Sequence, residues 1–372
     1  LSITSDGGIG FGGDGSDLGA GIKHLDGDSH LFEGALIIGN SSSYISNKFR
    51  GENQGPDLDF KTTSAVEEIF SKIADFEYTS RFTDGNTSLL TQLGITNKNY
   101  VFKHDQALNS IVYEYEIENL STSTINDIYV GLLLDWDIAN FANNKITYDQ
   151  ARKMGISLST DTSIYCGVRA LTDSIGSTHF GIDNVSDMAI NGGLDITGQN
   201  GFSDAEKFHV ISSQRNLAGG GTNSQGNDII DVNSIGPFSL EAGKKRSVAF
   251  SITISNNISL LNIESDTIKN LYERIVLSTQ SISGNSISSL LNISPNPAKD
   301  VLNLNLNLAK KTKLDLQVYN ANGKLVYYRS QENYNRGEQN INFPINDWKT
   351  GLYFIKMKGG GILFQDKFIV AN

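Results

Sequence analysis

The chain has 372 residues, of which 38% are hydrophobic and 19% charged, so it is long enough to form two or three hydrophobic cores. Its 37 glycines, 18 phenylalanines and 14 tyrosines, set against only 5 prolines, favour a turn-rich β architecture over an all-α fold. The formal net charge of −11 argues against a nucleic acid as the default partner, because phosphate binding requires a basic surface.

Disulfide-rich and membrane-spanning classes are also disfavoured. The single cysteine, Cys166, cannot form an intrachain disulfide, and its apolar surroundings favour a buried thiol over a nucleophile. No apolar run approaches the ~20 residues that a transmembrane helix needs. Because the sequence begins at Leu1, without Met or a basic signal segment, we expect a mature or trimmed fragment.

Residues 1–277 are predicted to form a large β-sandwich. The clearest strand is 111–118, in which Tyr113 and Tyr115 alternate with glutamates, as expected for a strand with one face buried. Further strands are predicted at 31–38, 100–102, 128–134, 164–171 and 246–254.

A few short helices are expected to interrupt this sandwich. One is predicted at 148–154 and another at 204–208, where Ser203 and Glu206 have the spacing of a capping box. A longer apolar period of about 3.6 residues predicts a helix over 258–277, with Asn256 or Asn257 as its N-cap.

A candidate cation site follows the strand at 128–134. Asp135 and Asp137 are two residues apart where the apolar run ends, so both carboxylates can point the same way, and Asn143 and Asp149 follow as further oxygen donors. An all-oxygen ligand set suits Ca²⁺ better than zinc. The alternative is a solvent-exposed aspartate pair that caps turns.

Catalytic signatures are missing from the sequence. It contains no Gly-x-Ser-x-Gly elbow, no His-Glu-x-x-His motif and no phosphate-binding Gly-rich loop ending in Gly-Lys-Ser/Thr. A free-standing extracellular hydrolase stays an alternative, because Glu33, Glu114 and Glu116 could meet other carboxylates in space.

The chain is predicted to divide near residue 285. Residues 278–289 form a Ser-rich linker, which separates an N-terminal domain, 1–277, from a C-terminal domain, 290–372. Residues 286–372 contain 11 basic and 6 acidic side chains, a balance of +5, whereas the residues before them carry 19 basic and 35 acidic side chains, a balance of −16. The net charge of −11 therefore conceals two opposed parts.

The C-terminal domain is predicted to be a small Ig-like β-sandwich. Four leucines alternate with asparagines over 302–308, which places all four leucines on one face of a strand, and the Asn322-Gly323 pair has hairpin-turn chemistry. Further strands are predicted at 314–318, 324–328, 340–343, 352–357 and 363–370.

Five motifs of this domain, in the same order, carry a resemblance: Ile293-Ser-Pro-Asn-Pro297, Val301-Leu-Asn-Leu, Val318-Tyr-Asn-Ala-Asn-Gly-Lys324, Thr350-Gly-Leu-Tyr-Phe-Ile355 and Lys367-Phe-Ile-Val370. The domain resembles the type A C-terminal sorting domain of type IX secretion cargo. The resemblance implies a secreted or surface-exposed protein of a Bacteroidetes-type bacterium, exported across the outer membrane. The residues that match the sorting signal are Pro295, Asn296, Pro297, Gly323, Lys324, Gly351, Tyr353 and Lys367.

The resemblance also implies partners: the translocon and shuttle proteins of the outer membrane, and a sortase-like peptidase that removes the signal. The alternative reading of residues 290–372 is an ordinary Ig-like adhesion module. For residues 1–285 we expect a non-catalytic module that binds an extracellular protein or glycan.

A weaker resemblance concerns the N-terminal domain. The segments Phe32–Gly39, Gly131–Asp137, Tyr165–Val168 and Gly236–Leu240 are similar to the non-catalytic region that follows the protease domain in secreted subtilisin-like enzymes. This resemblance implies that the chain is the accessory part of a serine protease whose catalytic domain lies upstream.

Overall fold

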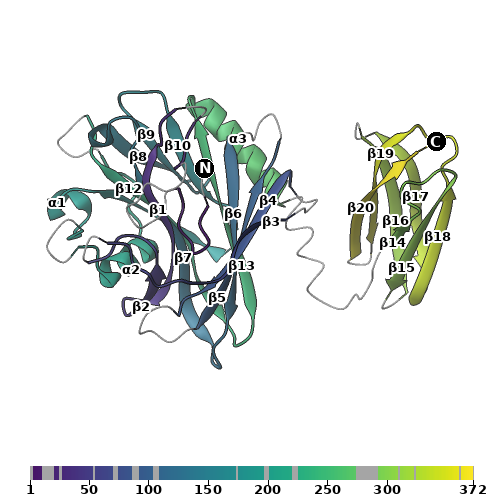
Figure 1. Ribbon diagram of the computed structural model, residues 1–372, viewed down its shortest axis with the longest axis horizontal. Coiled ribbons are helices and arrows are strands. Elements are labelled where there is room, and N and C mark those ends of the chain that lie inside the picture. Colours follow the sequence, from purple (N-terminus) through teal and green to yellow (C-terminus); the bar gives the residue numbers. More distant parts are fainter. Residues whose placement is uncertain are drawn as a thin grey trace. The chain divides into compact units, whose positions relative to one another are not determined.

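The computed structural model divides into two compact units, 1–272 and 273–372 (Figure 1). Each unit is mainly β, as the sequence predicts. The residues that the structure describes are 3–10, 21–24, 27–52, 55–69, 74–85, 92–103, 109–172, 175–196, 201–219, 225–273, 292–308, 311–321, 324–359 and 362–371. The predicted linker at 278–289 lies outside them.

Two antiparallel sheets form the N-terminal unit. The five-stranded sheet has the order β11-β12-β7-β1-β2, with strands Ser177–Asp183, Ile229–Leu240, Ile125–Trp136, Leu31–Ser41 and Tyr44–Asn47. The eight-stranded sheet has the order β3-β4-β5-β6-β13-β10-β9-β8, with strands Lys61–Ile69, Phe76–Thr83, Leu93–Val101, Ser110–Asn119, Lys245–Ser255, Tyr165–Ala170, Met154–Ser159 and Asn144–Asp149.

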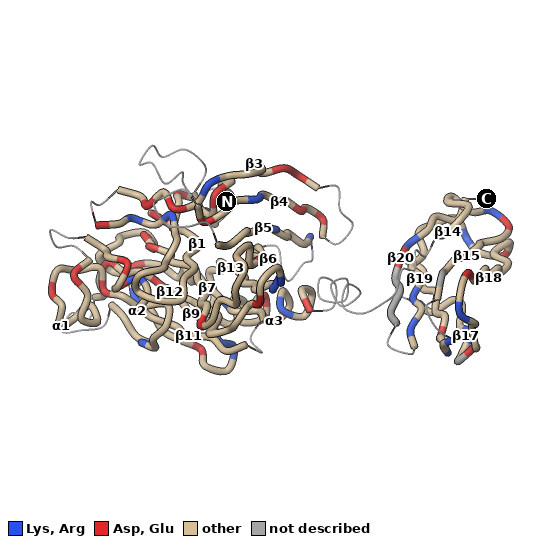
Figure 2. The backbone as a smooth tube through the Cα atoms, turned by 90° about the horizontal axis from the view of Figure 1, so that it is seen from below, with Lys and Arg blue, Asp and Glu red and all other residues tan. Residues whose placement is uncertain are grey.

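The main hydrophobic core is shared by strands of both sheets. Tyr113, Tyr115 and Ile117 of β6 pack in one buried cluster with Leu132 and Leu134 of β7. Their two-residue alternation is the one that the sequence predicts for 111–118, and it directs these side chains to the inner face of the sheet. Figure 2 marks acidic residues along this unit, in line with the balance of −16 counted before residue 286.

Helices lie against the sheets. The helix α2 (Asp204–Ser212) contacts β11 and β12 and has the predicted capping box, in which Ser203 and Glu206 bond reciprocally. The helix α3 (Ile258–Leu271) contacts β6, β10 and β13, and its N-cap is Asn257. Two short elements, α1 (Met188–Asn191) and the 3₁₀ helix Phe141–Asn143, complete the set of described helices. None of the described helices has the length and apolarity needed to cross a membrane.

One predicted helix is wrong. Residues 148–154 do not form a helix but belong to a hairpin: β8 ends at Asp149, β9 begins at Met154, and a turn joins them. Lys153 adopts a positive φ of 52° in this turn, a conformation that an α-helix does not contain. The alternating side chains of β8 and β9 therefore override the helix-favouring residues between them.

The C-terminal unit is a sandwich of two antiparallel sheets, as predicted. One has the order β14-β15-β18, with strands Asn292–Ser294, Val301–Leu308 and Gly337–Pro344. The other has the order β17-β16-β19-β20, with strands Leu325–Tyr334, Thr312–Asn320, Gly351–Gly359 and Ile362–Val370. The four alternating leucines of β15 are all buried in the core of this unit: Leu302, Leu304, Leu306 and Leu308.

Candidate cation site and sorting surface

Three neighbouring strands of the five-stranded sheet bring acidic residues together at one end of the sheet, where β7 ends and β1 and β12 begin. Trp136, at the end of β7, pairs with Leu31 at the start of β1 and with Ile229 at the start of β12. Because both partners run antiparallel to β7, the end of β7 lies between the beginnings of β1 and β12. Asp137 follows β7 and Asp228 precedes β12, so the topology places them close together.

The carboxylates of Asp135, Asp137 and Asp228 form a compact group. Each offers an oxygen atom, and these three atoms lie within 4.8 Å of one another. Asp135 is 2% exposed, and the other two are partly buried. The Oδ1 atoms of Asp135 and Asp228 are buried and accept no hydrogen bond from the protein.

Arg50 neutralises one side of this group. Its Nη1 atom lies 2.7 Å from Oδ2 of Asp135 and 2.9 Å from Oε2 of Glu33, a residue of β1. The backbone N–H of Arg50 also donates to Oε1 of Glu33. A single guanidinium therefore pairs with two carboxylates. Among the described ion pairs, none involves Asp137 or Asp228.

Burial, followed by repulsion between the carboxylates, raises the pKa values of the site. Burial, reinforced by repulsion from Asp135, raises the pKa of Asp137 to about 6. Burial, reinforced by repulsion from Asp135 and Asp137, raises the pKa of Asp228 to about 7. Burial also raises the pKa of Glu33 to about 7, although Arg50 acts in the opposite direction. An additional cation would stabilise the ionised form of all three.

The chemistry of the group fits a hard cation. Every ligand atom that the three carboxylates offer is an oxygen. The Oδ1 atom of Asp135 is buried and has no hydrogen-bond partner in the protein. Ca²⁺ prefers such oxygen ligands and accepts six to eight of them in flexible geometry.

The structure brings Asp135 and Asp137 together but holds the other two predicted ligands elsewhere. The Asn143 Nδ2 atom donates to both carboxylate oxygens of Asp161, at 3.1 and 2.9 Å. The Asp149 carboxylate accepts from Arg152, at 2.8 Å from its Nη1 atom. Both side chains are engaged in contacts of their own, and the carboxylate group described above includes neither.

Sequence reasoning missed Asp228 and Arg50. Asp228 directly precedes Ile229 and Ile230, which begin a buried strand, and this position at a strand end is the same kind of signal that singled out Asp135 and Asp137. Arg50 lies in a connection with no periodicity, so nothing in its neighbourhood indicates its partners.

The three glutamates considered for hydrolysis have different surroundings. Glu33 shares Arg50 with another carboxylate, that of Asp135, whereas Glu114 is buried on β6 and accepts from Tyr272 Oη and Ser247 Oγ. Glu116 forms an ion pair with Lys245 at 3.0 Å.

The predicted sorting residues fall into two places in the C-terminal unit. Asn296 lies between Pro295 and Pro297, and its side chain accepts from the backbone N–H of Ile369 in β20, the strand that also contains Lys367. Lys324, Gly351 and Tyr353 instead line a single hollow of about 480 Å³. Gly323 lies outside the described residues.

Tyr353 is fixed within this hollow. Its hydroxyl donates to the backbone carbonyl of Lys349 at 2.8 Å, and its ring lies 5.0 Å from that of Trp348 and 5.7 Å from that of Phe368. Tyr353 therefore connects the motif at 350–355 with the motif at 367–370 through the contact between its ring and that of Phe368.

Comparison with known families identifies this unit. A family model described as the secretion system C-terminal sorting domain matches residues 292–371. No curated protein matches the chain. The predicted resemblance to the accessory region of subtilisin-like proteases stays a prediction.

Similar solved structures are distant. A bacterial glucoamylase in complex with acarbose has a TM-score of 0.42 and 13% identity, with 67% of this chain and 30% of that chain covered. A polysaccharide lyase has a TM-score of 0.31 and 10% identity, covering 92% and 39%. The dimeric latent PorU of Porphyromonas gingivalis has a TM-score of 0.20 and 8% identity, covering 92% and 30%. The chain thus spans less than half the length of each.

Proposed function

Residues 292–371 are a type IX secretion C-terminal sorting domain, and from this premise we propose that the chain is an exported cargo whose N-terminal unit is a non-catalytic binding module stabilised by Ca²⁺. The sorting domain directs the protein to the cell surface or the extracellular space. The proposed partners are the outer-membrane translocon, its shuttle proteins and a sortase-like peptidase. The proposed ligands of the N-terminal unit are an extracellular protein or glycan.

The sorting role is tested by deleting residues 352–372 from the full chain in a type IX-competent host. This removes most of β19 and all of β20, and with them Tyr353 and Lys367. We expect the truncated chain to accumulate inside the cell while the intact chain reaches the surface or medium. Asp127→Asn, at an exposed position of the other unit, is the matched control and should be exported normally. Export of the truncated chain would refute the role.

The cation role rests on one observation: an oxygen of each of Asp135, Asp137 and Asp228 lies within 4.8 Å of the others, and Oδ1 of Asp135 is buried and unpartnered. Ionised carboxylates at this separation repel one another unless a cation lies between them. Extracellular Ca²⁺ sites bind in the range of about 10⁻⁴ to 10⁻³ M, so occupancy is expected only after export.

Thermal unfolding with Ca²⁺ and with EDTA tests this role. We expect Ca²⁺ to raise the Tm of the wild-type protein, because a ligand that binds only the folded state stabilises it. Asp137→Asn and Asp228→Asn should each abolish most of this increase, whereas Asp127→Asn should keep it. An equal Tm in Ca²⁺ and EDTA for the wild-type protein would refute the cation site.

A further inference from the structure

A second candidate site is a cleft at one end of the eight-stranded sheet. Its volume is about 490 Å³, within the size range of small-molecule pockets. It shares no lining residue with the group formed by Asp135, Asp137 and Asp228. Apolar side chains from the strand ends make up much of its lining: Phe76, Tyr78, Val101, Ile111, Ile252 and Ile254.

One wall of the cleft is an apolar row that crosses four neighbouring strands. Phe76 of β4 pairs with Val101 of β5, and Ile111 of β6 pairs with Ile252 of β13. Directly paired residues on antiparallel strands point their side chains to the same face of the sheet. Because neighbouring strands lie about 4.8 Å apart, a row across four of them extends over roughly 14 Å. An extended alkyl chain of medium length can therefore lie along this wall.

The basic side chains of the lining are Lys23 and His24, from the segment before β1. Lys23 is exposed and His24 is half-buried. No aspartate or glutamate is among the described residues that line the cleft, and Lys23 forms no ion pair with a described residue. The cleft thus combines an apolar wall with an unpaired ammonium group.

The carboxylate of Glu264 lies beside the cleft but does not line it. Glu264 belongs to α3 and is 8% exposed, and its Oε1 accepts from Nδ2 of Asn109, a lining residue, at 3.1 Å. Burial raises the pKa of Glu264, whereas the hydrogen bond from Asn109 and the charge of His24 act in the opposite direction. Since His24 interacts with Glu264, Lys23 is the cation that a ligand in the cleft can use.

We infer that this cleft binds a small amphipathic carboxylate of the medium-chain fatty acid type, with its alkyl chain along the wall from Phe76 to Ile252 and its carboxylate at Lys23. The alkyl chain is stabilised there because the wall removes it from water. A ligand rich in hydroxyl groups would leave many of them against side chains that form no hydrogen bonds. A cationic amphiphile would be repelled by Lys23.

This inference adds a small-molecule ligand to the N-terminal unit and does not depend on the protein or glycan proposed above. The test is titration calorimetry of the full chain with octanoate, hexanoate and octylamine, below the concentrations at which they form micelles. EDTA is present throughout, so the result is independent of the cation site.

We expect octanoate to bind with one-to-one stoichiometry. Octylamine has the same chain and the opposite charge, and we expect it to bind about tenfold more weakly or less. Hexanoate should bind about tenfold more weakly than octanoate, because two methylene groups fewer are removed from water. Absence of octanoate binding, equal affinity for octanoate and octylamine, or equal affinity for octanoate and hexanoate overturns the inference.

A charge reversal locates the carboxylate of the ligand. In Lys23→Glu we expect the affinity for octanoate to fall by about tenfold and the affinity for octylamine to rise, so that the preference for the anion is lost or reversed. Lys61→Glu, at an exposed lysine of β3 outside the cleft, makes the same change of charge and should keep the preference for octanoate. An equal preference in the two variants overturns the role of Lys23.

A change in the wall locates the alkyl chain. Phe76 is 37% exposed, so Phe76→Ala shortens the wall at a side chain that the core does not enclose. We expect octanoate affinity to fall by about fivefold or more. Phe141→Ala, at another exposed phenylalanine outside the cleft, should leave the affinity unchanged. The same affinity in Phe76→Ala as in the wild-type protein overturns the placement of the chain along this wall.

Discussion

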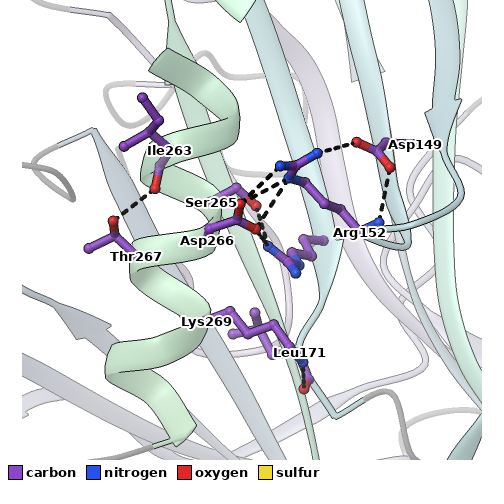
Figure 3. Close-up of polar contacts among 9 residues, drawn as sticks. Asp149, Arg152, Leu171, Ile263, Ser265, Asp266, Thr267 and Lys269 are labelled. Atoms are coloured by element: carbon purple, nitrogen blue, oxygen red, sulfur yellow. Dashed lines mark hydrogen bonds and ion pairs between the residues drawn. The ribbon is translucent and has the colours of Figure 1, made fainter. Parts of the chain in front are cut away.

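Arg152 and Asp266 are 114 residues apart in sequence and form an ion pair that joins helix α3 to the edge of the eight-stranded sheet (Figure 3). The Arg152 Nη2 atom lies 3.0 Å from Oδ2 of Asp266, and Nε lies 3.2 Å from Oδ1. Arg169 of β10 donates to the same carboxylate at 2.7 Å, and Arg152 also reaches Asp149. Four alternating charges thus link β8, β10 and α3.

We expect Arg152→Ala to lower the free energy of unfolding by about 1 kcal/mol. It removes two ion pairs that are partly exposed, and pairs of this kind contribute about 0.2–1 kcal/mol each. Urea unfolding measures the change. Lys245→Ala is the matched control: Lys245 also contacts two carboxylates but is 50% exposed, so a smaller loss is expected. A loss in Arg152→Ala no greater than in Lys245→Ala would contradict the structural role of the network.

This network explains why the sequence alone does not predict which carboxylates lie together. The spacing of Asp149 after Asp137 suggests a nearby oxygen donor, but its actual partner, Arg152, is three residues further on and is itself anchored by Asp266. The carboxylate of Asp228 lies close to that of Asp135 because β12 pairs with β7. Such pairing between strands distant in sequence leaves no local pattern.

Local signals, in contrast, predicted local structure well. The alternation over 111–118 predicted β6, the Ser203–Glu206 capping box predicted the start of α2, and Asn257 was among the expected N-caps of α3. Each of these depends on residues within a few positions of one another. The wrong helix at 148–154 shows the converse, because there the pairing of β8 with β9 decides the conformation.

The acidic site is expected to make stability fall as pH rises in the absence of Ca²⁺. The folded-state pKa values of Asp137 and Asp228 are raised from 3.8 to about 6 and about 7, so the folded protein binds more protons than the unfolded chain between those values. Their contribution to stability is therefore complete below pH 3.8 and is lost as pH rises through 6 to 7.

Thermal unfolding in EDTA between pH 5 and pH 8 measures this loss. The decrease in Tm over this range should be larger in the wild-type protein than in the Asp137→Asn, Asp228→Asn double variant, whose amides do not titrate. Saturating Ca²⁺ should reduce the difference between the two proteins at pH 8, because the cation stabilises the ionised carboxylates. Parallel pH profiles for the two proteins would contradict the prediction.

Gly155→Ala is expected to destabilise the N-terminal unit by about 3 kcal/mol. A Cβ at this position would lie 2.7 Å from Oδ1 of Asp231 and 2.8 Å from Nε2 of His179. These two atoms are themselves 2.9 Å apart in a fully buried pair, so neither side chain can move without losing its partner. Thermal unfolding measures the change. Gly55→Ala, where a Cβ meets nothing within 4 Å, should be near neutral, and equal effects at the two glycines would contradict the prediction.

Lys207 is a buried cation, fully inaccessible to solvent, on the inner side of α2. Its Nζ atom donates to Oδ2 of Asp57 and, at 3.1 Å, to Oδ1 of Asn47. Nearby, burial raises the pKa of Asp59 to about 6, and the charge of Lys207 counteracts this increase. Removing the ammonium therefore leaves two carboxylates without their cation.

We expect Lys207→Met to lower the free energy of unfolding by about 3 kcal/mol near neutral pH, as for other buried pairs that lose one partner. Without Lys207 the pKa of Asp59 rises further above its unfolded value, so the loss should be smaller at pH 5, where Asp59 is protonated, than at pH 8. Urea unfolding at both pH values measures this, with Lys61→Met, an exposed lysine of β3, as a control that should show little change at either pH. A loss that is equal at pH 5 and pH 8 would show that lost packing, and not unpaired charge, dominates the effect of the substitution.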